Sequence, residues 1–174
     1  MSNQIEVIEK ETEHTLEISA NVPMLKLPMV IGSSYKAIAE HLGKKGLECS
    51  GVPYVRYVDL NWSELNNENK FLSFIKMFTR KWNMLIGFPV KEKTEGEGNI
   101  KAGTIEKGKF VKTLHRGPYQ KVGAAYKAMG EFIKKENLKI KSESIEYYLN
   151  DPKTTKKKDL ETIVMIPIDI ERSN

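Results

Sequence analysis

Cysteine is almost absent from this chain of 174 residues, and Cys49 is the single example. One cysteine excludes an internal disulfide and any metal site that is built from several thiolates. We expect its thiol to be buried and inert. The three histidines, His14, His41 and His115, show no metal-ligand spacing and no nucleophile motif beside them. We therefore expect neither a metal nor a cofactor.

Long apolar runs are also missing. The longest strongly apolar stretch, residues 84–90, is far shorter than the roughly 20 residues that a membrane-spanning helix needs. Residues 5–13 mix charged and isolated apolar side chains and lack the continuous apolar region of a secretory signal. We expect a cytoplasmic protein without a membrane partner.

The charge has no strong bias of one sign. Lysine and arginine number 28 against 23 acidic residues, which gives +5, and much of the excess lies in short runs such as residues 156–158. The sequence has neither a helix-turn-helix signature nor a basic face with interleaved aromatic residues. We expect no direct nucleic-acid binding.

The sequence does contain an internal repeat, at an offset of 91 residues. Residues 32–59 align without a gap on residues 123–150, with eight identities in 28 positions. The identical pairs are Gly32/Gly123, Tyr35/Tyr126, Lys36/Lys127, Ala37/Ala128, Glu40/Glu131, Lys44/Lys135, Leu47/Leu138 and Tyr57/Tyr148. Such a repeat predicts two structurally similar halves.

Each half predicts a strand, a helix and two further strands. In the second half, alternation and β-forming residues predict strands over 109–115, 144–149 and 161–168, and helical spacing predicts a helix over about 122–138. In the first half, the corresponding segments are a strand within 16–27, a helix over about 33–45, and strands over 54–58 and 85–90. We expect one domain over residues 1–174, with a first repeat over about 16–91, a linker over 92–103 and a second repeat over 104–170.

The first half contains an insertion, predicted as a helix over about 63–82. Phe71, Ile75, Phe78 and Trp82 recur there at helical spacing on one face. Such a helix covers something apolar, either as a lid over the core or as a wall of a ligand site.

Three motifs together resemble the GyrI-like small-molecule-binding domain family, which also forms the effector-binding domain of multidrug-responsive bacterial regulators. They are residues 115–119 (HRGPY), residues 146–152 (EYYLNDP) and residues 161–168, separated by the predicted helix. The resemblance implies an α+β fold: a duplicated strand–helix–strand–strand unit with pseudo-twofold symmetry. It also implies an antiparallel sheet with both helices on one side and a ligand cleft between the halves.

The resemblance also implies a function and its alternatives. Members of the family bind lipophilic, often cationic, aromatic compounds by means of a buried glutamate among aromatic side chains. We therefore expect a stand-alone protein that senses or sequesters amphipathic aromatic compounds. The alternatives are a hydrolase that opens strained cyclopropane-type rings and a protein that modulates DNA gyrase.

Glu146 is the leading candidate for the polar anchor of a ligand. Residues two apart in a strand share a face, so Glu146 and Tyr148 are expected to project together. A carboxylate in an apolar cleft needs a partner, which a cationic ligand supplies. In an enzyme, Glu146 and Tyr148 would be the catalytic pair. The alternative role of Glu146 is an ion pair with lysine or arginine at a solvated edge.

The other candidates are ranked below Glu146. Tyr57 is the repeat equivalent of Tyr148, so both hydroxyls are expected near the pseudo-axis. Tyr54, Trp82 and Phe88 are candidate aromatic walls, although each also suits a core. Glu161 is a second candidate carboxylate at the start of a strand. Tyr35 and Tyr126 on the predicted helices are expected to be packing residues, and His115 is expected to belong to a turn.

Overall fold

The computed structural model describes residues 4–62 and 80–169. Within them, eight strands form one antiparallel sheet in the order β1-β6-β8-β7-β3-β4-β2-β5. The strands are β1 (Ile5–Lys10), β2 (Glu13–Pro23), β3 (Tyr54–Val58), β4 (Lys81–Val90), β5 (Ile100–Ile105), β6 (Gly108–Arg116), β7 (Ser144–Tyr148) and β8 (Glu161–Pro167).

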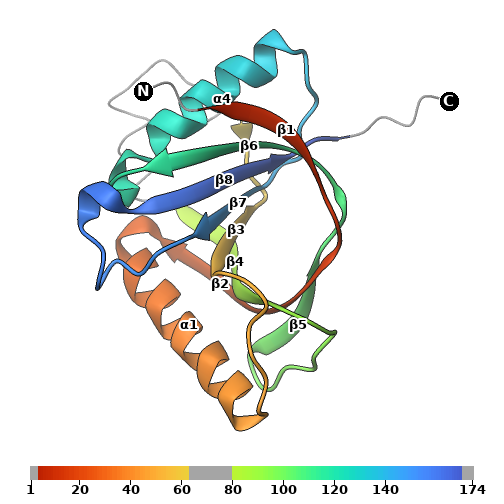
Figure 1. The fold of residues 1–174 in the computed structure, drawn as a ribbon, viewed down its shortest axis with the longest axis vertical. Coiled ribbons are helices and arrows are strands. Elements are labelled where there is room, and N and C mark those ends of the chain that lie inside the picture. The colour runs from red at the N-terminus through yellow and green to blue at the C-terminus, as the bar shows by residue number, and fades with distance from the viewer. Residues whose placement is uncertain (1–3, 63–79, 170–174) are drawn as a thin grey trace, which may run out of the picture.

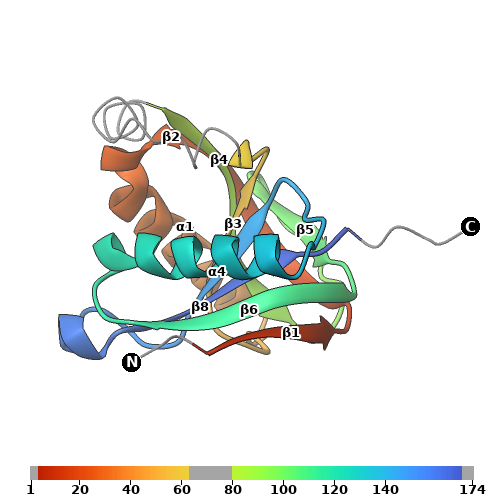
Figure 2. The ribbon, with the colours of Figure 1, turned by 90° about the horizontal axis from the view of Figure 1, so that it is seen from above.

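Two α-helices, α1 (Leu27–Lys44) and α4 (Gly123–Lys135), pack along the same side of this curved sheet (Figures 1 and 2). Short 3-10 turns occupy Met24–Lys26, Tyr119–Lys121 and Lys157–Asp159. The predicted α+β class, with an antiparallel sheet and two helices on one side, is confirmed. In the part of the chain that is described, neither helix is long and apolar enough to cross a membrane.

The strand–helix–strand–strand order occurs twice along the chain, as β2-α1-β3-β4 and as β6-α4-β7-β8. The two units meet where β3 pairs with β7 in the middle of the sheet. Val55 lies directly opposite Glu146 in that pairing, and the two positions are 91 residues apart, the offset of the predicted repeat. Glu146 and its repeat equivalent therefore face each other where the two units join.

Two strands were not predicted. β1 pairs with β6, and β5 pairs with β2, so they form the two edges of the sheet. β5 occupies the end of the segment that was expected to be a linker. Both strands lie outside the aligned repeat, and β1 pairs with a strand about 100 residues later, with Ile5 opposite Thr113.

Three other expectations need correction. α1 begins at Leu27, earlier than expected, with Pro28 in its first turn, where the missing N–H costs nothing. The predicted insertion helix lies largely outside the described residues, and Trp82, assigned to it from the sequence, belongs to β4. Cys49 is exposed, not buried, because it lies in the connection between α1 and β3.

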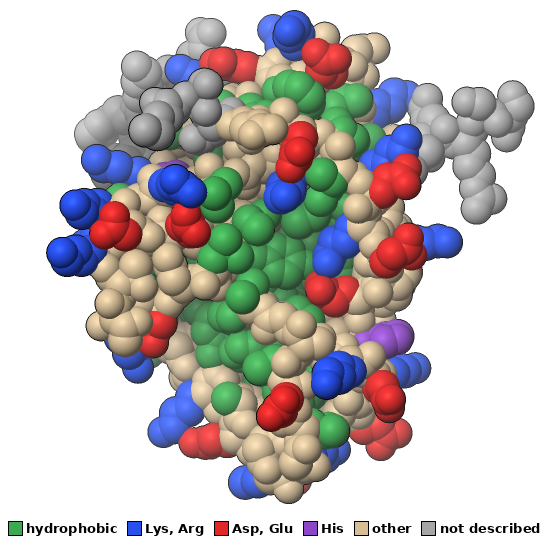
Figure 3. Space-filling model, in the orientation of Figure 1, with side chains coloured by type: hydrophobic (Ala, Val, Ile, Leu, Met, Phe, Trp, Pro, Cys, Tyr) green, Lys and Arg blue, Asp and Glu red, His purple; other side chains and the backbone are tan. Residues whose placement is uncertain are grey.

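The sheet has two different faces. The helix-covered face carries the buried residues Leu16, Val55 and Val164, and Ile38 of α1 and Met129 of α4 belong to the same buried layer. The other face, which we call the open face, carries Tyr54, Ile105, Phe110, Ile145, Tyr147 and Met165. Figure 3 shows hydrophobic side chains gathered in a hollow over the middle of the molecule.

Candidate functional site

Glu146 lies in the middle of β7 and is 6% exposed. Because side chains alternate along a strand, Ser144, Glu146 and Tyr148 share the helix-covered face, and Ile145 and Tyr147 project to the open face. The predicted pairing of Glu146 with Tyr148 on one face is thus what the structure shows.

Two tyrosines bind the Glu146 carboxylate. Tyr126 Oη of α4 donates to Oε1 at 2.8 Å, and Tyr148 Oη donates to Oε2 at 2.9 Å. Tyr126 Oη also lies 2.9 Å from Ser144 Oγ. Among the described residues, His115 acts on this carboxylate electrostatically, and no lysine or arginine does so. The carboxylate is therefore held by neutral donors.

Burial raises the pKa of Glu146 above its ordinary value of 4.5, because withdrawal from water disfavours the charged form. The hydrogen bonds from Tyr126 and Tyr148, and the nearby His115, act in the opposite direction on this pKa but do not cancel the effect of burial. His115 is itself buried, and its Nε2 lies 3.1 Å from the Pro118 carbonyl oxygen. The site thus combines a carboxyl group that can take up a proton with several hydroxyl donors.

Four tyrosines surround Glu146, two from strands and two from helices. They are Tyr57 of β3, Tyr148 of β7, Tyr35 of α1 and Tyr126 of α4, and all four are half-buried. Burial is the main reason why the pKa of each phenol is raised, and the Glu146 charge raises each one further. All four hydroxyls therefore remain neutral at physiological pH.

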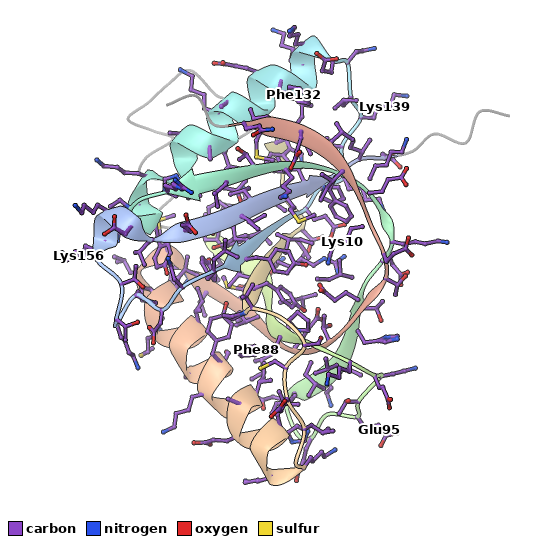
Figure 4. The ribbon with its side chains drawn as sticks, in the orientation of Figure 1. Lys10, Phe88, Glu95, Phe132, Lys139 and Lys156 are labelled. Atoms are coloured by element: carbon purple, nitrogen blue, oxygen red, sulfur yellow. The ribbon has the colours of Figure 1, made fainter. Side chains whose placement is uncertain are left out.

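Further aromatic rings extend this set. Tyr57 meets Trp82 edge-on, with ring centroids 5.9 Å apart, and Tyr35 meets Phe88 in the same way at 5.1 Å. Phe88 lies between the sheet and α1, where it packs on the buried core (Figure 4). The structure thus brings Trp82 and Phe88 to the face that carries Glu146.

Two predicted candidates lie elsewhere. Tyr54 projects to the open face, where its hydroxyl donates to the buried carboxylate of Glu17 and its ring lies 5.7 Å from that of Tyr147. Glu161 opens β8 and makes an ion pair with Arg116, with Oε1 2.9 Å from Nε. The next residue, Thr162, lies between His115 of β6 and Tyr148 of β7, its partners on the two neighbouring strands.

Sequence reasoning gave no role in the site to Tyr35, Tyr126 or His115. The signal for the two tyrosines was present, since they are an identical pair in the repeat, but a tyrosine on a helix is equally typical of core packing. His115 was assigned to a turn, and its ring does contact Pro118 in that turn while also facing Glu146. Across residues 4–62 and 80–169, no cluster of three or more possible metal ligands is present.

A family model for the GyrI-like small molecule binding domain matches residues 71–169, more than half of the 174 residues. The chain belongs to the GyrI-like family. This confirms the family predicted from the three motifs and assigns the chain to a family of small-molecule-binding domains. The match includes β7 with Glu146 and α4 with Tyr126.

Solved structures share the fold of this GyrI-like domain. The C-terminal domain of EcmrR is similar with a TM-score of 0.73 and 17% identity, covering 97% of this chain and 99% of that one. A hydrolase from Listeria innocua is similar with a TM-score of 0.63 and 15% identity, covering 95% and 92%. SAV2435 bound to tetraphenylphosphonium is similar with a TM-score of 0.57 and 10% identity, covering 97% and 94%. Among curated proteins, none matches the sequence.

Proposed function

We propose that this GyrI-like domain binds amphipathic aromatic compounds, cationic ones included, at Glu146 on the helix-covered face. The observation that carries the proposal is the environment of Glu146: a 6% exposed carboxylate whose two bonded donors are tyrosine hydroxyls. Half-buried aromatic rings lie around it. A buried carboxylate that is surrounded by partly exposed aromatic rings suits a ligand that supplies the missing positive charge.

The physical reason lies in the cost of a buried charge. An ionised carboxylate out of water is unfavourable unless a counter-charge or strong hydrogen bonds compensate it. A cationic ligand supplies the counter-charge, and tyrosine and tryptophan rings attract the same cation through their π-faces. SAV2435, which shares the fold, was solved with tetraphenylphosphonium, a cation that carries aromatic rings.

The direct test is calorimetric titration of tetraphenylphosphonium into the wild type, Glu146→Gln and Glu161→Gln. We expect Glu146→Gln to weaken binding by about 30-fold or more, since a desolvated charge pair is worth roughly 2–5 kcal/mol. Glu161→Gln is the matched control, because it removes a carboxylate on the open face and should leave the affinity unchanged. Equal affinity of the wild type and Glu146→Gln would contradict the proposal.

A second candidate function is hydrolysis of a strained cyclopropane-type ring. The proximity of a carboxyl group with a raised pKa to tyrosine hydroxyls favours it, and a hydrolase shares the fold. Glu146 would take a proton from water as the water oxygen bonds to a ring carbon and the ring C–C bond breaks, and Tyr57 or Tyr148 would protonate the released carbon. The proton on Glu146 would then pass to the tyrosinate, which restores both groups for the next turnover. Mass spectrometry should then show a product heavier by one water, formed over many turnovers and lost in Glu146→Gln. Stoichiometric binding without such a product would exclude hydrolysis.

A further inference from the structure

We infer that Tyr35 is a second polar anchor of this site and that the ligand is an aromatic cation that also carries a hydrogen-bond acceptor, such as a carbonyl oxygen. The inference rests on the proposed function, because it concerns the same ligand. It adds that the ligand must carry a hydrogen-bond acceptor, which the carboxylate of Glu146 does not require.

The starting point is a hydroxyl without a partner. Among the described residues, three buried side-chain polar atoms make no hydrogen bond: Tyr35 Oη, Thr162 Oγ1 and His14 Nδ1. Such atoms are rare in folded proteins, and each one calls for an explanation. His14 lies on β2 opposite Val90 and Thr104, whereas Tyr35 belongs to the tyrosines around Glu146.

The contrast with Tyr126 is informative, because Tyr35 and Tyr126 are equivalent in the predicted repeat. Tyr126 donates its proton to Glu146, but Tyr35 has no carboxylate to bond, since Val55 takes the place of Glu146 in the first half. The two oxygens of Glu146 accept protons from Tyr126 and Tyr148, and Tyr35 bonds to neither oxygen. The Tyr35 hydroxyl is a donor without an acceptor.

The surroundings of Tyr35 indicate which ligand atom would meet it. Glu146, Tyr57 and Tyr119 lie close enough to raise its pKa further, after burial, so the hydroxyl stays protonated and can donate. Its ring rests edge-on against Phe88, which fixes the side chain from one side. A ligand cation near Glu146 would thus have an O–H donor within the same set of rings.

Thr162, the other unpaired hydroxyl, is a less suitable anchor for the ligand. It is fully buried at 0% exposure, in the sheet between His115 and Tyr148. Tyr35, in contrast, is half-buried on a helix. The Tyr35 hydroxyl is buried but its side chain is partly exposed, so a ligand against that ring lies next to the hydroxyl, whereas Thr162 has no exposed part.

The test uses matched probes: 1-methylquinolinium cations with an acetyl group at each ring position in turn, and their isopropenyl counterparts. The two substituents have the same shape, and only acetyl accepts a hydrogen bond. In calorimetric titrations of the wild type, at least one acetyl isomer should bind about tenfold more tightly than its counterpart, the value of one net hydrogen bond. Tyr35→Phe should abolish this preference, so that each acetyl cation binds no more tightly than its isopropenyl counterpart.

Two controls separate this role from a structural one. Tyr126→Phe, the equivalent change in α4, should keep the acetyl preference. Free Tyr35→Phe should unfold in urea at the wild-type midpoint or above it, because no hydrogen bond is lost. Isopropenyl cations that bind without any acetyl preference, or a preference that persists in Tyr35→Phe, would overturn the inference and leave the proposed function standing. If none of the cations binds the wild type, both fail.

Discussion

Glu146 occupies a position in the sheet where aliphatic residues are usual. Its strand neighbours on either side, Val55 and Val164, are both fully buried, and its own carboxylate has tyrosine donors in place of water. This arrangement stabilises the ionised form in part and leaves the pKa raised. Burial of this carboxylate thus costs folding free energy, and in the function that we propose the same carboxylate binds the cation.

The raised pKa predicts how binding depends on pH. A cation prefers the ionised carboxylate, so acidification through the pKa of Glu146, above 4.5, should weaken the binding of tetraphenylphosphonium by about tenfold per pH unit. Titrations at a series of pH values measure this slope. In Glu146→Gln, the affinity should be low and should not follow this slope.

His115 is the other titratable group that acts on Glu146, and the tyrosines around it remain neutral. His115→Gln removes any contribution of the imidazole to the pH profile. The acid-side loss of affinity should persist in that variant. Its disappearance would assign the pH dependence to His115 and contradict the role of Glu146.

The sequence predicts which side chains of a strand project to the same face of the sheet, but it does not predict what those side chains contact. Alternation places Glu146 with Tyr148, and the same rule puts Tyr54 and Tyr57, three residues apart, on opposite faces of β3. Tyr54 therefore cannot share the site with Tyr57 and Tyr148. The bond from Tyr126 to Glu146 depends on how α4 packs on the sheet, which no local pattern specifies.

At the scale of elements, the pairing of β3 with β7 brings the two units together. Val55 faces Glu146 there, and both are buried. This pairing predicts that a second acidic residue at position 55 would place two carboxylates side by side in an apolar environment. Like charges at such a distance repel strongly, and neither would have a counter-charge.

Val55→Glu should therefore lower the free energy of unfolding by about 3–5 kcal/mol at pH 7. Val55→Thr, with the same shape and one hydroxyl, should cost only about 1–3 kcal/mol. Urea unfolding of the two variants and the wild type measures the difference. Equal stability of Val55→Glu and Val55→Thr would mean that position 55 is not enclosed with Glu146.

Replacing glycine by alanine should change the free energy of unfolding in opposite directions at two positions, one in α4 and one in β5. Gly130 lies on the exposed side of α4 with nothing within 4 Å of an added Cβ, so Gly130→Ala should raise the free energy of unfolding by about 0.5–1 kcal/mol. At Gly103 in β5, the added Cβ would lie 2.4 Å from Glu17 Cδ. Gly103→Ala should destabilise by about 1–3 kcal/mol.

Thermal or urea unfolding checks both glycine variants in one series. A stable Gly103→Ala protein would mean that the Glu17 side chain can move away at little cost. The Gly103 variant also tests whether β5 packs against β2 as closely as the structure shows.

Elements inside the repeat could be predicted because two copies of one pattern support each other. The strand predicted over 54–58 and the start of the strand predicted at 161 coincide with β3 and β8. The edge strands β1 and β5 have no such second copy, and their partners lie far away or across the other unit. Non-local pairing of this kind is set by the arrangement of the whole sheet.

At the scale of the whole molecule, aromatic side chains lie at two places on the sheet. One is the helix-covered face with Glu146. The other is an apolar hollow of about 250 Å³ on the open face (Figure 3), lined by Ile8, Glu9, Lys10, Val52, Lys112, Tyr147, Leu149, Ile163 and Met165. In this hollow, Lys10 Nζ lies 5.5 Å from the centre of the Tyr147 ring and pairs with Glu13, and on the other face Arg80 lies 5.2 Å from the centre of the Trp82 ring. Each face thus has one ring already covered by a cation, so our preference for the helix-covered face rests on the buried carboxylate of Glu146.

The most direct measurement is a crystal structure of the protein with tetraphenylphosphonium bound. We expect the phosphonium centre to lie beside the Glu146 carboxylate, with the phenyl groups against the rings of Tyr57 and Tyr148. A cation seated instead in the open-face hollow, against Tyr147 and Met165, would contradict it.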